Sequence, residues 1–225
     1  MNSPQEAKPP VTRQCEVAPK IIITKKLYRC VRTQYFYYFC SSLDFDMKQE
    51  VAYNGLTFEP YISKEEIDAR IKQLAQEIER DCAGTCPLFL CVLNGAFVFA
   101  SDLFRAVDMD AGISFIRLQS YSGTGSTGVV KEIVGLTENI EGRTVIVVED
   151  IVDSGNTIVE LKNILSERGA AESRICTLLL KPDAYKKDIK IDYVAMEIPN
   201  DFIVGFGLDY DELGRNYKDI YVLDA

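Results

Sequence analysis

The chain has 225 residues, of which 47% are hydrophobic and 26% are charged, as expected of a globular protein with one sizeable α/β domain or two small ones. It contains no histidine, which excludes a catalytic imidazole and histidine-ligated zinc. Its formal net charge is −9. This acidic balance disfavours nucleic acid and anionic membranes as partners, because both bind clustered lysine and arginine, whereas it suits divalent cations.

The chain contains seven cysteines, and none of them belongs to a CxxC pair. We interpret them as free thiols in a reducing compartment. No apolar run approaches the ~18 residues that a membrane-spanning helix needs. No signal-type hydrophobic region precedes the aromatic cluster YFYYF at residues 35–39. These observations predict a cytoplasmic protein with no membrane partner.

Residues 1–46 differ in character from the rest of the chain. They are proline-rich, then basic, then aromatic, and they hold seven Lys and Arg against four Asp and Glu, so the remainder carries a net charge of −12. The stretch that begins at Met47 is typical of the start of a bacterial-type protein. We predict an upstream extension over residues 1–46, disordered or non-native, and a functional domain over residues 47–225. A targeting arm is the alternative, and N-terminal sequencing of the native protein distinguishes the two.

From residue 63 onward the pattern predicts alternating helices and strands. A capping box at residues 63–66 is followed by Ile67, Ile71, Leu74 and Ile78, so we expect an amphipathic helix that ends near Arg80. Further helical patterns cover residues 96–107 and 156–168. Short apolar runs predict strands at residues 88–93, 113–118, 129–134, 144–148, 174–180, 193–196 and 220–223. This alternation indicates a mostly parallel sheet with helices on both faces.

Three carboxylates follow one predicted strand in the string VIVVEDIVDSGNT at residues 145–157. Glu149, Asp150 and Asp153 come directly after the apolar run. In an open parallel sheet, ligands bind outside the carboxyl ends of the strands. The string therefore places three negative charges where a ligand is expected.

The helix after this strand begins within residues 153–157. Gly155 allows the backbone to approach a ligand closely, and the amides at the helix start attract phosphate, helped by the hydroxyls of Ser154 and Thr157. The pattern predicts a phosphate next to a metal-bound or polyhydroxylated group. The alternative interpretation is that Asp153 or Ser154 only caps the helix and that the other carboxylates form a solvated strand end.

The whole string resembles the phosphoribosyl-pyrophosphate signature of the type I phosphoribosyltransferases, and the resemblance covers roughly residues 50–225. It implies that family's α/β fold, a mostly parallel central sheet flanked by helices with a small hood subdomain. The similarity is strongest to the branch that salvages hypoxanthine and guanine. It therefore implies a magnesium-dependent enzyme that transfers the phosphoribosyl group of phosphoribosyl pyrophosphate to a 6-oxopurine base, giving IMP or GMP and pyrophosphate. Homodimers or homotetramers are implied as well.

The resemblance also implies roles for residues of the string. Glu149 and Asp150 hold the ribose hydroxyls, directly or through Mg²⁺, and Asp153 is the general base that accepts the purine N7 proton. The 5′-phosphate is bound by Asp153, Ser154, Gly155, Asn156 and Thr157.

At the purine end of the site, the resemblance implies four residues. Lys181 donates to the 6-oxygen of the purine, Phe202 stacks on the ring, and the backbone of Ile203 pairs with the base edge. Asp209 lies near the 2-substituent of the base and helps to hold a second Mg²⁺, which makes Glu149, Asp150 and Asp209 the implied metal ligands.

At the pyrophosphate end, the resemblance implies Arg215 and the amides of Asn94 and Gly95. Some family members carry Lys or Arg at the position of Asn94, so here the backbone is expected to hold more of the pyrophosphate; a plain turn is the alternative. Ser120 and Tyr121 resemble the start of a mobile loop that closes over the site.

Other functions are possible for parts of the pattern. The stretch at residues 123–128 is a formal GxGxxG, but strand-like residues follow it, which argues against a dinucleotide site. A regulator of the same fold that binds nucleotide and RNA would need a basic face, and a net charge of −12 disfavours it. A non-catalytic relative is disfavoured because Asp153 and Lys181 are present.

Overall fold

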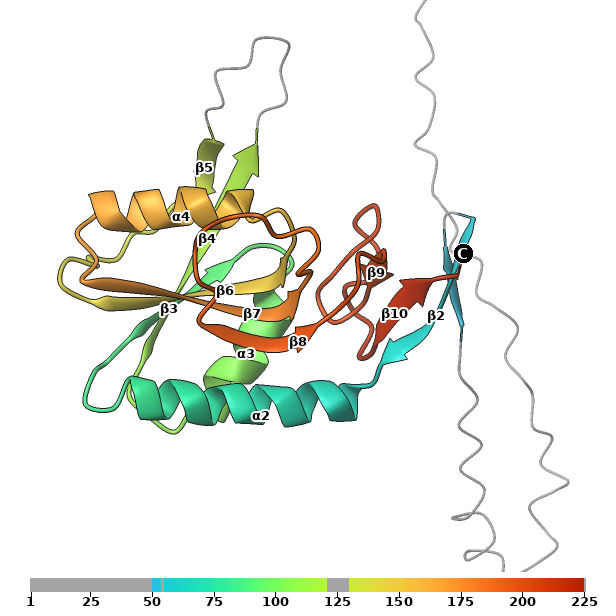
Figure 1. Ribbon diagram of the computed structural model, residues 1–225, viewed down its shortest axis with the longest axis horizontal. Helices are drawn as coiled ribbons and strands as arrows, with labels where there is room; N and C mark the ends of the chain where they lie inside the picture. Colours follow the sequence, from blue (N-terminus) through green and yellow to red (C-terminus); the bar gives the residue numbers. More distant parts are fainter. Residues whose placement is uncertain (1–49, 54, 121–129, 225) are drawn as a thin grey trace, which may run out of the picture. The chain divides into compact units, whose positions relative to one another are not determined.

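The structure is a computed structural model that describes residues 50–53, 55–120 and 130–224 (Figure 1). The predicted extension at residues 1–46 lies outside the described residues, and its boundary stays a prediction. Tyr121 and the rest of the predicted mobile loop also lie outside the described residues.

A six-stranded sheet forms the centre of the described domain. Its strand order is β5-β4-β3-β6-β7-β8, and all neighbours are parallel except β4 and β5. The predicted mostly parallel sheet is therefore confirmed, with strand ends within a few residues of those expected. The strands are β3 (Leu88–Val92), β4 (Gly112–Ser120), β5 (Val130–Val134), β6 (Thr144–Val152), β7 (Glu172–Leu180) and β8 (Tyr193–Glu197).

Helices cover both faces of this sheet (Figure 1). α2 (Lys64–Asp81) and α3 (Phe97–Ala106) lie on one face, and α4 (Asn156–Glu167) lies on the other. The predicted cap is present, because the Ser63 hydroxyl accepts a hydrogen bond from the Glu66 amide. The buried strands supply both cores, since Ile146 faces α2 and α3 whereas its neighbour Val147 faces α4.

A second, antiparallel sheet forms the hood, with strand order β1-β2-β10-β9. It contains β1 (Val51–Tyr53), β2 (Leu56–Ile62), β9 (Ile203–Val204) and β10 (Ile220–Leu223). Of these four hood strands, the hydrophobic pattern predicted only β10. β9 is too short to give a period, and β2 contains a proline, which weakens a strand signal.

The end of β6 differs from its predicted position in a way that affects the site. The strand predicted to end at Val148 continues to Val152, because its pairing with β7 continues through Glu149 opposite Thr177 and Val152 opposite Leu180. Glu149 and Asp150 therefore belong to the last part of β6, where the sheet fixes their direction.

The cysteines and the apolar character of the helices can also be compared with the sequence. The described cysteines are all free, with Cys82, Cys91 and Cys176 buried and Cys86 exposed. Among the residues that the structure describes, no helix is both long enough and apolar enough to cross a bilayer.

Candidate active site

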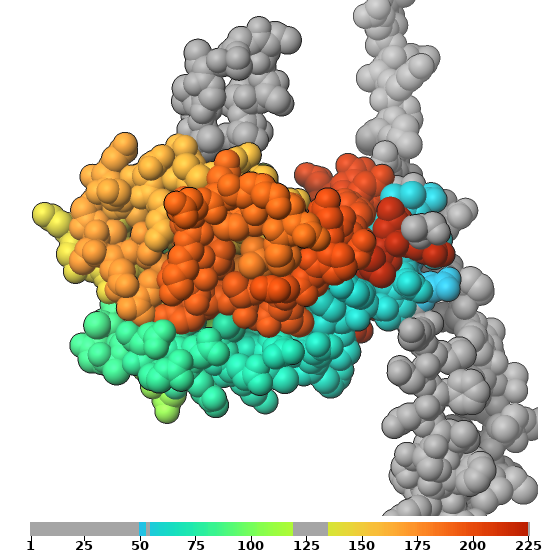
Figure 2. Space-filling view, in the orientation of Figure 1, coloured from blue at the N-terminus to red at the C-terminus, as the bar shows by residue number. Residues whose placement is uncertain are grey.

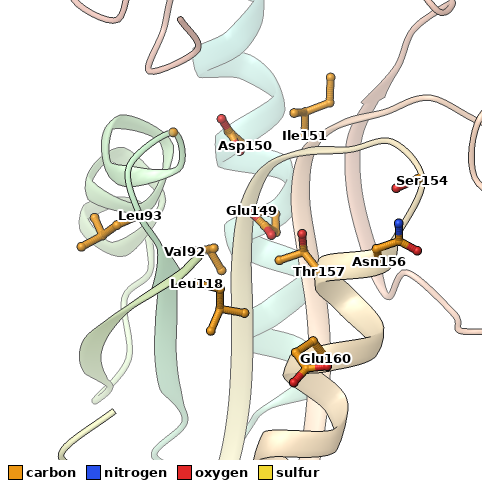
Figure 3. A pocket seen from close by; sticks show the side chains of 11 residues that line it. Val92, Leu93, Leu118, Glu149, Asp150, Ile151, Ser154, Asn156, Thr157 and Glu160 are labelled. Carbon is orange, nitrogen blue, oxygen red and sulfur yellow. The ribbon is translucent and has the colours of Figure 1, made fainter. Parts of the chain in front are cut away.

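A cavity of about 600 Å³ opens where the carboxyl ends of β3, β4 and β6 meet the start of α4. Figure 3 shows side chains from the ends of β3 and β4 on one side and those from the start of α4 on the other, with Glu149 and Asp150 between them. The sheet and helix therefore bring together Glu149 and Asp150, the predicted ribose residues, with three of the predicted phosphate residues, Ser154, Asn156 and Thr157. The cavity is lined by Val92, Leu93, Gly95, Leu118, Glu149, Asp150, Ile151, Ser154, Asn156, Thr157 and Glu160.

The turn between β6 and α4 has the form expected of a phosphate-binding loop. Gly155 is the N-cap of α4 with a left-handed φ of 77°, a conformation that favours glycine. Ser154, Asn156 and Thr157 are exposed and line the cavity. The amides of the first helical turn lack partners within the helix and carry the positive end of its dipole. An anion is therefore attracted to this corner of the cavity.

Glu149 and Asp150 are adjacent carboxyl groups in a poorly solvated place. Glu149 is only 6% exposed, and burial together with the charge of Asp150 raises its pKa well above the ordinary value. Burial also raises the pKa of Asp150 to about 6, although hydrogen bonds from backbone amides and the charge of Arg215 act in the opposite direction. The charged forms of both groups are therefore disfavoured until a cation or hydrogen-bond donors enter.

The loop after β3 passes directly against Asp150. A Cβ atom on Gly95 would lie 1.7 Å from Asp150 Oδ2, so a side chain at this position would displace the Asp150 carboxylate. The Leu93–Asn94 peptide bond is cis. On the other side, a Cβ atom on Gly207 would lie 2.2 Å from the carbonyl oxygen of Gly95. Three chain segments therefore lie in close contact beside the carboxylate.

Arg215 and Asp209 reach the same place from the hood. Arg215 pairs with Asp209 Oδ1 at 2.6 Å and donates to the carbonyl oxygen of Gly207 at 2.6 Å. Its charge lowers the pKa of Asp150, and the charge of Asp209 raises it. Asp209 is thus near the acidic pair, but it is bound to arginine. The described part of the chain holds no group of three acidic, cysteine or histidine side chains arranged to bind an ion.

The predicted general base and the predicted purine lysine lie next to each other. Lys181 is buried and its Nζ lies 4.0 Å from Asp153 Oδ2, whose side chain is exposed. The Lys181 amide donates to the carbonyl oxygen of Val152 at 3.0 Å, which fixes the lysine beside the end of β6. Neither side chain lines the cavity itself.

The two residues predicted to contact the face and the edge of the base, Phe202 and Ile203, lie in the hood. Phe202 is 44% exposed, and its ring makes an edge contact with Tyr210 at 5.5 Å and a tilted contact with Phe58 at 6.2 Å. Ile203 is buried in β9. Neither residue lines the cavity.

Ser120, which was predicted to lie at the start of the mobile loop, is the last residue of β4.

The cavity also contains residues that the sequence reasoning missed. Glu160 lies one turn after Thr157 on α4, and this spacing places both on one face of the helix. The contact between Gly207 and Gly95, outside the lining of the cavity, was not predicted either. Helical spacing contained a signal for Glu160, whereas the contact between Gly207 and Gly95 joins distant parts of the chain and leaves no local signal.

Comparison with known proteins identifies the family of the chain. The chain matches the phosphoribosyl transferase domain over residues 63–211. The chain belongs to this phosphoribosyl transferase family. It is 44% identical over 162 residues to the hypoxanthine-guanine phosphoribosyltransferase of Streptococcus thermophilus, a match that covers 72% of this chain and 90% of that protein. The corresponding enzyme of Mycobacterium tuberculosis is 43% identical over 170 residues, covering 72% and 84%.

Solved structures show the same fold. The match to a hypoxanthine-guanine phosphoribosyltransferase from Bacillus anthracis has a TM-score of 0.70 and 42% identity, and it covers 73% of this chain and 98% of that one. The match to the hypoxanthine phosphoribosyltransferase of Trypanosoma cruzi in complex with IMP has a TM-score of 0.70 and 34% identity, covering 77% and 97%. The family resemblance and the fold inferred from the sequence are confirmed.

The raised pKa of Asp150 predicts how stability depends on pH. The folded state has a pKa of about 6 against an ordinary value of 3.8, so the fold favours the protonated carboxyl. That contribution is present below about pH 4 and is lost as the pH rises through 6. Asp150→Asn is therefore expected to gain roughly 3 kcal/mol of unfolding free energy relative to the wild type between pH 4 and pH 8. Urea unfolding in chelator-treated buffer measures this difference.

Asp183→Asn is the matched control, because Asp183 is exposed on the loop after Lys181. Its difference from the wild type, measured over the same pH range, is subtracted as the baseline. A difference for Asp150→Asn that stays constant with pH after this subtraction would show that Asp150 ionises normally in the folded protein.

Proposed function

We propose that the chain is a purine salvage enzyme that transfers the phosphoribosyl group of phosphoribosyl pyrophosphate to hypoxanthine, and also to guanine, giving IMP or GMP and pyrophosphate. The observation that carries the proposal is the cavity in which Glu149 and Asp150 lie beside the anion-attracting start of α4. The relatives named above support it, among them a phosphoribosyltransferase bound to its product IMP.

In the proposed complex, the donor lies along the carboxyl ends of β6 and β3. Its 5′-phosphate accepts hydrogen bonds from the amides and hydroxyls of the turn at residues 153–157, and its ribose hydroxyls face Glu149 and Asp150. Its pyrophosphate lies against the amides of Asn94 and Gly95, near Arg215. This arrangement follows the polarity of the site, because the phosphate groups meet amides and arginine and the hydroxyls meet carboxylates.

The reaction breaks the bond between the anomeric carbon and pyrophosphate and forms a bond from that carbon to the purine. Positive charge develops on the ribose, where Glu149 and Asp150 stabilise it, and negative charge develops on pyrophosphate, where Arg215 stabilises it. Holding the two reactants in line contributes further, because it converts a bimolecular step into an internal one.

Asp153 and Lys181 are proposed to act on the base. Lys181, which lies 4.0 Å from Asp153, donates to the 6-oxygen of the purine and so selects 6-oxopurines. Asp153 accepts the proton that leaves N7, so no net charge remains on the ring. Phe202 stacks on the purine face, while the backbone of Ile203 and the neighbourhood of Asp209 read the base edge.

The residues of the site fit Mg²⁺, which we propose as the cofactor. Magnesium binds oxygen ligands and is held in many phosphate-transfer sites by one or two carboxylates together with substrate phosphates. Glu149 and Asp150 supply two such carboxylates, and burial raises the pKa of each, so a bound cation would favour their charged forms. Asp209 is the proposed ligand at the pyrophosphate end. When bound, magnesium neutralises charge on pyrophosphate and makes it a better leaving group.

Incubation of the purified protein with phosphoribosyl pyrophosphate, Mg²⁺ and one purine at a time tests the function. We expect nucleotide formation with hypoxanthine and guanine and none with adenine, because Lys181 requires an acceptor at the 6-position. Product formation should stop when a chelator removes the metal and return when Mg²⁺ is restored. If the donor binds but none of these bases reacts, the protein is not a phosphoribosyltransferase of this class.

Asp153→Asn tests the proposed general base. The variant cannot accept the N7 proton, so we expect kcat to fall by about 10²- to 10⁴-fold. Binding of phosphoribosyl pyrophosphate, measured by calorimetry, should change little. Asp183→Asn serves as the control and should keep full activity. A kcat within a few-fold of the wild type for Asp153→Asn would remove Asp153 as the base.

We further propose that the protein acts in the cytoplasm as a homodimer or homotetramer. The four described free cysteines agree with a reducing compartment. Phe97, the first residue of α3, and Phe115 of β4 are 46% and 42% exposed. A second copy of the chain that covered these two rings would remove apolar surface from water.

Sedimentation velocity tests the assembly. Phe97→Ser and Phe115→Ser should each shift the protein toward monomer, because each removes apolar contact area from the interface. Leu213→Ser is the control, since Leu213 is also exposed but belongs to the hood turn. If both phenylalanine variants keep the wild-type mass, this surface is not the interface.

A further inference from the structure

Lys64 links the first turn of α2 to two other parts of the fold. Its Nζ donates to Asp102 of α3 at 3.2 Å and to Asp68 one turn along α2. The same ammonium lies 5.3 Å from the ring centre of Phe206, which is within cation–π distance. Its backbone amide donates to Asp219 Oδ1 at 2.7 Å. One residue therefore joins α2, α3 and the hood.

The Phe206 ring belongs to a turn that needs such support. Phe206 is 1% exposed and has a φ of 47°, a conformation that residues other than glycine seldom adopt and that persists only where contacts hold it. Its amide donates to the carbonyl oxygen of Tyr217, and the amide of Gly207 donates to that of Arg215, both at 3.0 Å. The turn at residues 205–208 is therefore bonded to the segment that carries the arginine.

The same turn contacts Gly95, which lines the cavity. Gly207 lies against the carbonyl oxygen of Gly95, with no room for a Cβ atom, and its own carbonyl oxygen accepts a hydrogen bond from Arg215. Gly95 in turn lies against Asp150. A shift of Phe206 would therefore displace Arg215 and the Gly95 loop together.

We propose that Lys64 is a positioning residue for the pyrophosphate end of the site. Its ammonium, held by Asp102, fixes the ring of Phe206, and the turn that follows sets Gly207 and Arg215 against Gly95. The proposal rests on the proposed function and deepens it by naming a residue, outside the cavity, that sets the affinity for pyrophosphate.

The part of the base end that lies in β9 should be less sensitive to Lys64 than Asp209, which is paired with Arg215. Ile203 precedes the turn and is paired with Val222 of β10, and the bond from Lys64 to Asp219 uses the backbone amide, which Met and Arg at this position keep. Changing the Lys64 side chain therefore disturbs the turn and leaves the β9–β10 pairing in place.

The test compares Lys64→Met, Lys64→Arg and Lys72→Met with the wild type. Lys72 is an exposed lysine of α2 that lines the same surface hollow as Lys64. For Lys64→Met we expect KM for phosphoribosyl pyrophosphate, and KM for pyrophosphate in the reverse reaction, to rise by about three- to thirty-fold. KM for hypoxanthine should stay within about two-fold of the wild-type value. Lys64→Arg, which keeps the cation, should restore most of the affinity, and Lys72→Met should match the wild type.

Hydrogen exchange gives a second measurement that does not depend on turnover. Amides of residues 205–217 should exchange faster in Lys64→Met than in the wild type or in Lys72→Met, while those of β10 stay protected. An inactive wild type would contradict the proposed function, and the exchange data would still decide the role of Lys64. The proposal is overturned if exchange is unchanged in Lys64→Met, if all three KM values rise together, or if Lys72→Met has the same effect.

Discussion

The candidate site is centred on one close contact, between the main chain at Gly95 and the carboxylate of Asp150. A side chain at Gly95 would displace that carboxylate, and a side chain at Gly207 would meet the carbonyl oxygen of Gly95. Three segments that are far apart in the sequence meet here: the loop after β3, the end of β6 and a turn of the hood. In the proposed complex, the backbone amides of the first segment, the carboxylates of the second and the arginine of the third act on one substrate.

The charges around this contact are arranged for a substrate that is itself charged. Burial and mutual repulsion disfavour the ionised forms of Glu149 and Asp150 in the free protein. In the proposed complex, a metal-bound sugar phosphate supplies the missing positive charge, and its phosphates meet the amides at the start of α4. We propose that the acidic pair, which destabilises the free protein, thereby makes the site selective for a cation-bound, phosphorylated sugar.

Much of the fold could be predicted from local pattern, because buried parallel strands are continuous apolar runs and amphipathic helices repeat their apolar residues. The hood could not, since β9 contains only two residues and β2 pairs with β10, which lies far away in the sequence. The string around Asp153 predicted the turn between β6 and α4 for the same local reason. The contacts of Gly95 with Asp150 and of Lys64 with Phe206 depend on tertiary packing, so no local pattern contains them.

A crystal structure with phosphoribosyl pyrophosphate and Mn²⁺ in place of Mg²⁺ would show whether the donor binds across Asp150 and Gly95, because manganese can be located from its anomalous signal. We expect a manganese peak within coordination distance of Glu149 or Asp150 or of the donor oxygens facing them. We also expect the 5′-phosphate at the amides of residues 154–157 and the pyrophosphate beside Gly95 and Arg215. A donor bound elsewhere, or a manganese peak away from both the acidic pair and the pyrophosphate, would contradict the proposed binding mode.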